Sequence, residues 1–507
     1  MEKAKVKSIL KIILKVLCVL GILLAFCAFF SAAWYIKTFG KVGFSSILFT
    51  LFSNMKGTAS GIVFNYLLKG LLPSVLCAAI TSVIVFYRGK KIRLTFKNPE
   101  KDKKVQIYPF ASWVKAAVSV VLCVCLWISA VQRIELPSWA VNAVTKTKLY
   151  DTEYIDPKGV KITFPKEKKN LIYIYVESLE TTFISEENGG GVKDNLIPEL
   201  YALADENINF SNNDGVGGWP VVTDTVWTVA SMVSQTSGVP FSGGIEGNAA
   251  ATVNKEFLPG VTSINDILKK NGYYQTLMVG SDAAFGGRDK YFKTHGIDKI
   301  YDIHTARKDG IVAPDYDVWW GMEDKHLFRY AKQELSKISK GDKPFNFTML
   351  TVDSHHPEGY TCDICPKIHD EKYENVLSCT SKQVGDFVEW IKQQDFYENT
   401  VIVIAGDHMS MNNTYFSENM NPKFRRHIYN CFINSQLETK HSKNRVFTPF
   451  DMYPTTLSAM GCKIKGERLG LGTNLLSGKK TVAERMGMEN FNHELSKHSE
   501  YYNSTFI

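Results

Sequence analysis

The sequence predicts an α/β protein in which N-terminal transmembrane helices precede an extracytoplasmic domain built on a mostly parallel sheet sandwiched by helices. Two observations lead to this class. Three long apolar runs lie within the first 131 of the 507 residues. Beyond residue 169, amphipathic helical stretches alternate with short, continuous apolar runs, which are typical of strands buried on both faces. Repeated helix–strand units favour a parallel sheet covered by helices.

The three apolar runs span about 8–36, 61–87 and 110–131. Each is long enough to cross a hydrocarbon core, which takes about 20 apolar residues. Residues 1–131 are therefore predicted to form a membrane domain with three transmembrane helices. The alternative for the first run is a cleaved signal peptide, but this run exceeds the usual apolar region of about 7–15 residues and two more follow. A shorter apolar piece, 43–53, lies at the interface or extends the second span.

Basic residues give these helices an orientation. The chain carries 59 Lys+Arg against 51 Asp+Glu, a formal charge of +8, and the excess gathers in the first 15 residues and in 88–104. Both segments adjoin apolar runs, so neither has the setting of a nucleic-acid arm and no nucleic-acid partner is expected. The positive-inside bias places both in the cytoplasm. With three spans, everything after about residue 132 is then extracytoplasmic.

The rest of the chain divides by composition into three parts. Residues 132–168, with three prolines and mixed charge, are predicted to be a juxtamembrane connector. Residues 169–485 form the predicted catalytic domain, and 486–507 a polar tail. The domain begins with the strand in KKNLIYIYVES. Three helix–strand pairs follow: SINDILKKNGY with YQTLMVGS, KHLFRYAKQELSKISKG with PFNFTMLTVDSHHP, and SKQVGDFVEWIKQQD with NTVIVIAGDH.

Polar side chains end three of these strands. Glu177 follows the first, Asp353 and His355 follow the third, and Asp407 and His408 follow the last. Ligands of open α/β sheets bind beyond the carboxyl ends of the strands, so these side chains are expected to converge. Carboxylates with an imidazole suit a divalent cation such as Mn²⁺, Zn²⁺ or Mg²⁺. The alternative for a single carboxylate, such as Glu177, is a helix N-cap.

A nucleophile is expected in GVGGWPVVTDTVWTVASMVSQTSGVPF, where glycines and a Thr/Asp-rich turn precede a helical stretch. A hydroxyl at a helix N-terminus is favoured by the helix dipole and by metal coordination. The alternative is a threonine that only caps the helix. Composition alone leaves Thr223, Thr225 and Thr228 open.

The cysteines fall into two groups. Five lie in the apolar spans and five follow, of which Cys362, Cys365 and Cys379 are close in sequence. In an extracytoplasmic domain a disulfide within this group is favoured. A zinc site on CDIC is the alternative, although no second pair has matching spacing.

Several segments resemble a known family, the membrane-anchored phosphoglycerol transferases of the alkaline phosphatase/sulfatase superfamily. This family includes lipoteichoic acid synthase and the periplasmic-glucan phosphoglycerol transferase, and the likeness is closer to the glucan branch. It covers roughly residues 150–480 and rests on NLIYIYVESLETTF, WTVASMVSQTSGVP, TVDSHHPEGY, GDHMSM and FDMYPTTLSAMG…RLGLGTNLL. The resemblance implies a sulfatase-like fold in a multi-pass protein of the bacterial cell membrane. The implied reaction is metal-dependent transfer of glycerol phosphate from phosphatidylglycerol to a cell-surface or periplasmic glycan, through a phospho-threonine intermediate and with release of diacylglycerol.

The resemblance also assigns roles to single residues. One divalent cation, with Mn²⁺ favoured over Zn²⁺ and Mg²⁺, would be bound by Glu177, Thr225, Asp407 and His408, and Thr225 would be the nucleophile. The substrate would be bound by His355 at the donor phosphate, by Arg288 at the glycerophosphate group and, as a weaker match, by Asp282. The chain departs from the lipoteichoic acid synthase pattern because it lacks the tryptophan near that arginine.

Three alternatives have the same fold or anchor. A phosphoethanolamine transferase would differ only in its head-group pocket. A catalytically inactive, membrane-anchored binding or sensor domain would lack bound metal, and a phosphodiesterase-like hydrolase would let water intercept the intermediate. Sulfate-ester hydrolysis is disfavoured, because no Cys or Ser stands in the C/S-x-P-x-R setting of a formylglycine nucleophile.

Overall fold

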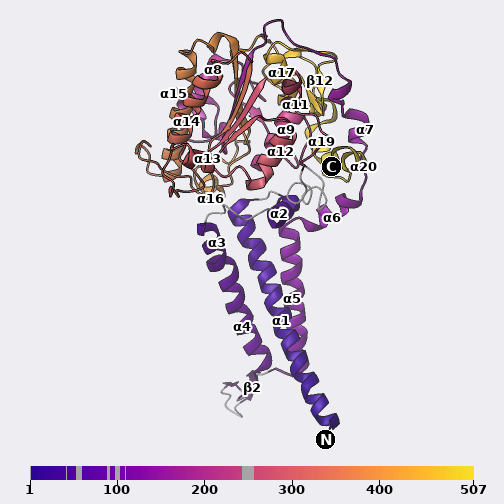
Figure 1. Ribbon diagram of the computed structural model, residues 1–507. Coiled ribbons are helices and arrows are strands. Elements are labelled where there is room, and N and C mark those ends of the chain that lie inside the picture. The colour runs from indigo at the N-terminus through magenta and orange to yellow at the C-terminus, as the bar shows by residue number, and fades with distance from the viewer. Residues whose placement is uncertain are drawn as a thin grey trace. The chain divides into compact units, whose positions relative to one another are not determined.

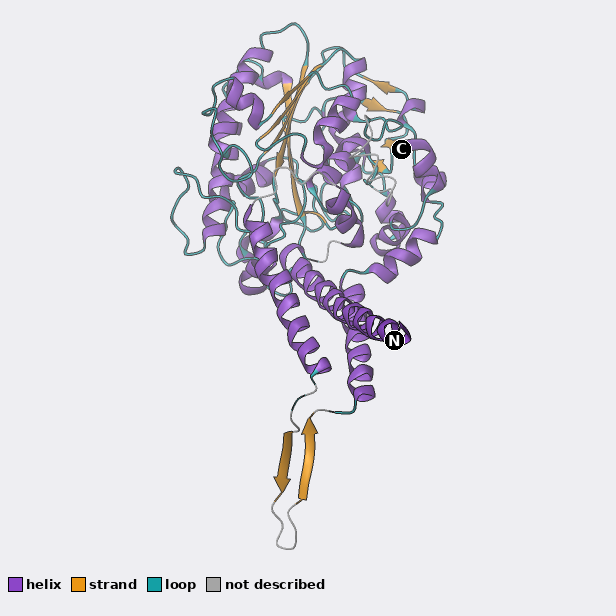
Figure 2. Cartoon of the chain, turned by 60° about the horizontal axis from the view of Figure 1, so that its bottom comes forward, coloured by secondary structure: helices purple, strands orange, loops and turns teal. Residues whose placement is uncertain are grey.

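The computed structural model describes residues 2–40, 43–52, 60–87, 89, 92–96, 103–108, 110–241 and 256–507. The predicted cytoplasmic segment 88–104 and the end of the apolar piece 43–53 lie partly outside the described residues. The chain divides into two compact units. One consists of Met1–Lys41 with Ala59–Ser138, and the other of Val42–Thr58 with Trp139–Ile507. The ribbon in Figure 1 and the cartoon in Figure 2 show the elements of both.

The first unit contains three long apolar helical segments. Val6–Phe39, Gly61–Phe86 and Ser112–Arg133 have the length and apolar composition needed to cross a membrane, in agreement with the three predicted runs. The elements are α1 (Glu2–Phe39), α3 (Ser60–Tyr66), a π-helical turn (Leu67–Leu71), α4 (Leu72–Phe86), the antiparallel strands β1 (Ile92–Phe96) and β2 (Lys103–Tyr108), and α5 (Ser112–Arg133).

Few side chains of this unit are buried. Ile22, Ala25 and Phe26 of α1 pack with Ala78 of α4 and Leu126 of α5. Most other apolar side chains on these helices are exposed, and so large an apolar surface on a folded protein marks a contact with lipid or protein. The three helices fit a membrane protein with a C-terminal domain.

The second unit is built around a mixed seven-stranded sheet, which confirms the predicted α/β class. The strand order is β5-β10-β9-β4-β8-β6-β7. Strands β9, β4, β8, β6 and β7 are parallel, β10 runs antiparallel to β9, and β5 is antiparallel to β10. The strands are β4 (Asn170–Val176), β5 (Gly218–Trp219), β6 (Tyr274–Val279), β7 (Lys299–Tyr301), β8 (Phe345–Leu350), β9 (Thr400–Gly406) and β10 (Ile428–Ile433).

Both faces of the sheet are buried, as the continuous apolar runs predict. Leu171, Tyr173 and Tyr175 of β4 belong to one hydrophobic core, whereas the alternating Ile172 and Ile174 belong to the other. This alternation follows from the two-residue period of a strand. Helices therefore cover the sheet on both sides (Figure 1). On the first side lie α9 (Thr228–Ser237), α11 (Ile264–Lys270), α12 (Arg288–Thr294) and α17 (Pro449–Ala459), and on the second α8 (Pro198–Glu206), α13 (Ile303–Lys308), α14 (Asp324–Ile338) and α15 (Lys372–Lys392).

The C-terminal segment 486–507, predicted as a polar tail, contains two helices. Helices α19 (Met488–Leu495) and α20 (Glu500–Phe506) place Phe491 and Phe506 in the core of this unit, fully buried. Their few apolar residues fall on one helical face, so a polar average composition conceals them.

The other α-helices and strands of this unit are short. They are α2 (Gly43–Phe52), α6 (Leu136–Val144), α7 (Leu149–Glu153), β3 (Ile162–Thr163), α16 (Asn413–Asn419), β11 (Lys463–Ile464), β12 (Arg468–Leu469), β13 (Gly472–Thr473) and α18 (Val482–Met486).

Candidate active site

Strand register brings the predicted carboxylates together. In the parallel pair β4–β9, Val176 lies opposite Gly406, so the next residues of the two strands, Glu177 and Asp407, emerge side by side. His408 follows directly. These three residues, here called the acid–imidazole trio, are all buried and could hold one metal ion.

The imidazole of His408 faces both carboxylates. Its Nε2 lies 3.4 Å from Asp407 Oδ2 and 3.6 Å from Glu177 Oε1. Its Nδ1 lies 2.9 Å from the Met409 carbonyl oxygen, so Nδ1 carries the hydrogen and donates it to that carbonyl. In the neutral ring, Nε2 is then an acceptor, and it faces the carboxylates of Glu177 and Asp407. A backbone partner on the far nitrogen is the usual second contact of a metal-binding histidine.

One oxygen of Asp407 is fully used and the other is not. Oδ1 accepts hydrogen bonds from the backbone N–H groups of Ser178 and His408, both at 2.8 Å. Oδ2 is buried and has no hydrogen-bond partner among the described residues. A buried carboxylate oxygen without a partner is costly and calls for a ligand. The trio therefore fits a divalent cation.

The electrostatics show the same need for positive charge. Burial and the neighbouring Glu177 raise the pKa of Asp407 to about 7, although His408 and two backbone N–H groups oppose the shift. Burial alone would lower the pKa of His408, but the two carboxylates raise it above its ordinary value. Two acids and one imidazole in a buried space thus hold more negative charge than they can neutralise among themselves.

The hydroxyl that approaches the trio belongs to Thr228. Its Oγ1 lies 3.4 Å from His408 Nε2, at the first residue of α9. The hydroxyl of Thr225, the predicted nucleophile and metal ligand, donates instead to the Val222 carbonyl at 2.9 Å. Thr223 donates to the Asn492 carbonyl at 3.2 Å. Of the three threonines that composition leaves open, Thr228 is the one with a described contact to the trio.

Helix α9 is fixed to the end of β9 by a buried glutamine. Gln235 Nε2 donates to the Gly406 carbonyl at 3.1 Å, and its Oε1 accepts from the Tyr173 hydroxyl at 2.7 Å. All residues of α9 from Val229 to Ser237 are buried. The positive end of the helix dipole therefore faces the site from a rigid position, and it favours negative charge on the Thr228 oxygen.

Arg288 supplies the buried cation next to this site. It is 3% exposed and donates from Nη2 to Ser281 Oγ at 2.8 Å and to the Asp282 carbonyl at 2.6 Å. Burial lowers its pKa to about 10, while Glu177 and Asp282 oppose this shift. The guanidinium therefore stays charged at neutral pH.

The remaining predicted substrate residues are placed differently. Burial lowers the pKa of His355 to about 4, so this imidazole is neutral, and its Nδ1 contacts the His356 carbonyl at 2.9 Å. The carboxylate of Asp282 is directed to His304 Nε2, 3.2 Å away, and the group of Asp282, Asp302 and His304 is a second, more exposed set of metal-type ligands. Asp282 contacts Arg288 through its backbone carbonyl.

A tryptophan that sequence reasoning missed lies beside these residues. The ring of Trp320 is 4.3 Å from that of His355 and 5.5 Å from that of Phe285, and the Phe285 ring lies 5.7 Å from Arg288 Cζ. An aromatic side chain is therefore present near the arginine, but it comes from a separate loop. The only signal in the sequence is the dipeptide in DYDVWWG, which has no fixed spacing from Arg288.

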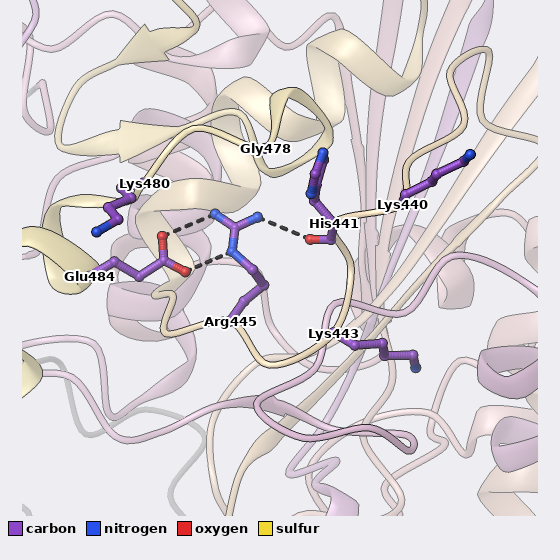
Figure 3. A pocket seen from close by; sticks show the side chains of 7 residues that line it. All are labelled: Lys440, His441, Lys443, Arg445, Gly478, Lys480 and Glu484. Atoms are coloured by element: carbon purple, nitrogen blue, oxygen red, sulfur yellow. Dashed lines mark hydrogen bonds and ion pairs between the residues drawn. The ribbon is translucent and has the colours of Figure 1, made fainter.

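A pocket of about 410 Å³ lies in another part of the second unit (Figure 3). Its lining is mostly basic, and Arg445 in its wall is already paired with Glu484 through Nε at 2.6 Å. None of the residues that line it belongs to the trio. They are Lys440, His441, Lys443, Arg445, Gly478, Lys480 and Glu484.

Comparison with known proteins identifies the family to which this chain belongs. The family described as Sulfatase matches residues 169–462, which contain the trio, Thr228 and Arg288. The chain belongs to the sulfatase family. Similar curated proteins are called phosphoglycerol transferase I. The one from Escherichia coli O6:K15:H31 (strain 536 / UPEC) is 33% identical over 329 residues, and the one from Salmonella choleraesuis (strain SC-B67) is 34% identical over 328. Each match covers 62% of this chain and 40% of the relative.

The sulfatase family fold extends to a solved membrane protein. The lipooligosaccharide phosphoethanolamine transferase A from Neisseria meningitidis matches with a TM-score of 0.51 at 13% identity, over 92% of this chain and 87% of that chain. At this identity the likeness shows the fold alone. The fold agrees with the predicted class.

Proposed function

We propose that this protein transfers glycerol phosphate from phosphatidylglycerol to a cell-surface or periplasmic glycan, through a covalent intermediate on Thr228. The observation that carries the proposal is the contact between Thr228 Oγ1 and His408 Nε2 within a buried acid–imidazole trio. The curated relatives named phosphoglycerol transferase support the head group. Because the match spans only 40% of those relatives, the activity, the donor and the acceptor are inferences for this chain.

The metal would be held by Glu177, Asp407 and His408, with the Thr228 hydroxyl beside them. Mixed carboxylate and imidazole donors suit Mn²⁺, Zn²⁺ and Mg²⁺, and we favour Mn²⁺. When bound, a divalent cation supplies Lewis-acid neutralisation of the phosphoryl charge. Thr225 takes no part in this assignment, because its hydroxyl is hydrogen-bonded to Val222.

The reaction balances in two displacements. Thr228 Oγ1 forms a bond to phosphorus while the bond from phosphorus to the diacylglycerol oxygen breaks, and diacylglycerol leaves with the threonine proton. A glycan hydroxyl then bonds to phosphorus, the bond to Thr228 breaks, and Oγ1 regains a proton. Splitting the transfer into two steps is the usual advantage of a covalent intermediate.

Arg288, His355 and Asp282, which lie around the trio, would contact the substrate. Arg288, a buried guanidinium that stays charged, would offset negative charge on the phosphoryl oxygens. His355 is neutral at pH 7 and its Nδ1–H donates to the His356 carbonyl, so its Nε2 would accept a hydrogen bond, for example from a substrate hydroxyl. Asp282 would act on the glycerol hydroxyls only if its contact with His304 opened.

The membrane helices suit a lipid donor. In our proposal, residues 1–131 anchor the protein with the N-terminus in the cytoplasm, a connector at 132–168 follows, and the sulfatase domain lies outside the bacterial cell membrane. A domain tethered at the surface of a bilayer meets a lipid substrate at high effective concentration.

A second candidate is phosphoethanolamine transfer, because a solved phosphoethanolamine transferase has the same fold. That transferase matches 92% of this chain. The displacements would be the same and only the lipid head group would differ. The test below therefore includes both lipids.

The test is the intact mass of the full-length protein in detergent, after incubation with Mn²⁺ and phosphatidylglycerol or phosphatidylethanolamine. We expect a glycerophosphate adduct on the wild type and on Thr225→Ala, and none on Thr228→Ala. An adduct lost only in Thr225→Ala would return the nucleophile to Thr225. An adduct from the ethanolamine lipid alone would establish the second candidate. Neither adduct nor diacylglycerol from either lipid would overturn the transferase assignment.

A further inference from the structure

The side chains of three cysteines meet between the loop that follows His355 and helix α15. Cys362 Sγ lies 3.4 Å from Cys365 Sγ and 3.9 Å from Cys379 Sγ, and all three residues are at most 9% exposed. Cys362 and Cys365 stand in a tight turn, in which the Cys365 N–H donates to the Cys362 carbonyl at 3.2 Å. Cys379 comes from the first half of α15. A loop and a helix thus present their sulfurs to one point.

Two N–H groups are directed at these sulfurs. The backbone N–H of Cys362 donates to Cys365 Sγ at 3.3 Å, and Gln383 Nε2, one helical turn after Cys379, donates to Cys379 Sγ at 3.4 Å. Sulfur accepts hydrogen bonds weakly as a thiol and more strongly as a thiolate. Donors placed around ligand sulfurs are the outer contacts that orient thiolate ligands and tune a metal site.

We propose that Cys362, Cys365 and Cys379 bind a thiophilic divalent ion of the zinc class, separate from the ion at the trio. Thiolates about 2.3 Å from a tetrahedral ion lie about 3.8 Å from one another, and the two sulfur–sulfur distances of Cys362 bracket this value. A disulfide would use two of the sulfurs and leave the third unpaired, whereas one ion uses all three. Binding releases the thiol protons to solvent.

The fourth position of this ion has carboxylate candidates. Asp363 and Glu323 each place an oxygen within 4.8 Å of Cys362 Sγ. Both are now paired with Lys325, Asp363 at 2.5 Å and Glu323 at 3.1 Å. Water fills the position if Lys325 keeps these partners, as at zinc sites with three protein ligands.

The ion would connect the segment 353–365, which carries His355, to α15. The N–H of Gly359 donates to the His355 carbonyl at 3.0 Å, and the N–H of Tyr360 to the Asp353 carbonyl at 2.7 Å. The chain then passes directly into the CDIC turn. Cross-linking this turn to Cys379 would therefore limit the motion of the segment that carries His355.

The experiment uses the full-length protein in detergent, purified without oxygen. We expect one equivalent of zinc that is absent from the double variant Cys362→Ser/Cys379→Ser and retained in Cys431→Ser, a buried cysteine of β10 whose sulfur contacts the Leu203 carbonyl. Exchange into Co²⁺ should give the intense sulfur-to-metal charge-transfer absorption of a thiolate site in the wild type and in Cys431→Ser. The trio has no sulfur and cannot produce this band.

A thiol count on the wild type decides the matter even if the double variant does not fold. After denaturation with a chelator and no reductant, all ten cysteines should react with an alkylating agent. A protein with two unreactive cysteines within this group, restored by reductant, contains a disulfide and overturns the proposal. Ten reactive thiols with no thiolate–Co²⁺ band overturn it as well.

Discussion

The hydroxyl of Thr228 lies 3.4 Å from Nε2 of His408, although 180 residues separate them in the sequence. The contact exists because α9 starts at Thr228 and is held by Gln235 to the last carbonyl of β9. One helix end and one strand end therefore deliver a hydroxyl and an imidazole to the same point. The Thr228 hydroxyl thus lies beside the proposed metal ligands, where a bound cation would lower the pKa of the hydroxyl and so activate it.

The first prediction concerns the Thr228 hydroxyl itself. Thr228→Ala should reduce diacylglycerol release on the order of 10³-fold or more, because a nucleophile has no substitute. Thr228→Ser retains the hydroxyl and should lose about tenfold or less, because only the methyl group that limits its rotamers is removed. Steady-state kinetics with unchanged thermal unfolding of the variants would check this. Equal losses in Ala and Ser variants would contradict a nucleophilic role.

The second prediction concerns pH and the metal. The pKa of Asp407 is raised to about 7 from an ordinary 3.8, so the folded metal-free protein holds this proton more tightly than the unfolded chain does. Stability from this group is fully present below about pH 4 and is lost as the pH rises through about 7. A divalent ion needs the charged carboxylate, so its apparent affinity should fall about tenfold per pH unit below 7.

Thermal unfolding with and without Mn²⁺, between pH 5.5 and 8, measures both effects. The metal should raise the melting temperature strongly at pH 8 and weakly at pH 5.5. Asp407→Asn should abolish most of the metal-induced shift at either pH. A shift that is independent of pH in the wild type would show that Asp407 is not a ligand.

The third prediction concerns an ion pair between a buried carboxylate and a partly exposed arginine that supports the segment after His408. Glu180 is fully buried, and its Oε2 accepts a hydrogen bond from Arg426 Nε at 2.7 Å. Arg426 Nη2 donates to the Ser410 carbonyl at 2.6 Å. The Ser410 N–H also donates to Glu180 Oε1 at 3.0 Å. Glu180→Gln should lower the free energy of unfolding by about 1.5–3 kcal/mol, because it removes the charge that strengthens the hydrogen bonds from Arg426, whose side chain is 20% exposed.

An exposed pair provides the matched control. Lys382 and Asp386 on α15 lie 3.2 Å apart with both side chains more than 60% exposed. Asp386→Asn should change the free energy of unfolding by less than about 0.5 kcal/mol. Chemical denaturation of the metal-free protein compares the two. Equal small effects would mean that the pair at Glu180 is not a structural support.

Much of the fold follows from sequence periodicity, and the site only in part. Continuous apolar runs predict β4 and β9, and the carboxylates that follow them meet because adjacent parallel strands end together. The nucleophile was harder to place. Thr223, Thr225 and Thr228 all suit a helix start, and which hydroxyl faces the trio depends on where α9 begins, a boundary that propensity does not define to one residue.

The tryptophan was missed for a different reason. Trp320 reaches His355 and Phe285 across loops, and no periodic pattern fixes how loops fold over a site. The C-terminal helices were obscured by composition, because Phe491 and Phe506 lie in a segment that is rich in polar residues. In each case a tertiary contact determines the structure, and local sequence does not record it.

The last prediction assigns head-group recognition to Trp320. Its Nε1 is buried without an acceptor among the described residues, so this N–H can donate to a substrate oxygen. Trp320→Ala should raise the KM for phosphatidylglycerol about tenfold and change kcat less, since it removes contact with the head group and leaves Thr228 in place. Trp320→Phe keeps an aromatic ring but removes the N–H, so it separates the contribution of stacking from that of the hydrogen bond.

The neighbouring Trp319 is the matched control, because its ring contacts Tyr360, at 6.3 Å, and not His355. Trp319→Ala should leave the KM within about twofold of the wild type if recognition depends on the ring beside His355. Kinetics with phosphatidylglycerol and phosphatidylethanolamine would be measured for all three variants. If Trp320→Ala lowered kcat with both lipids and left KM unchanged, Trp320 would be holding His355 in position, and selection of the head group would then depend on Arg288 and Asp282.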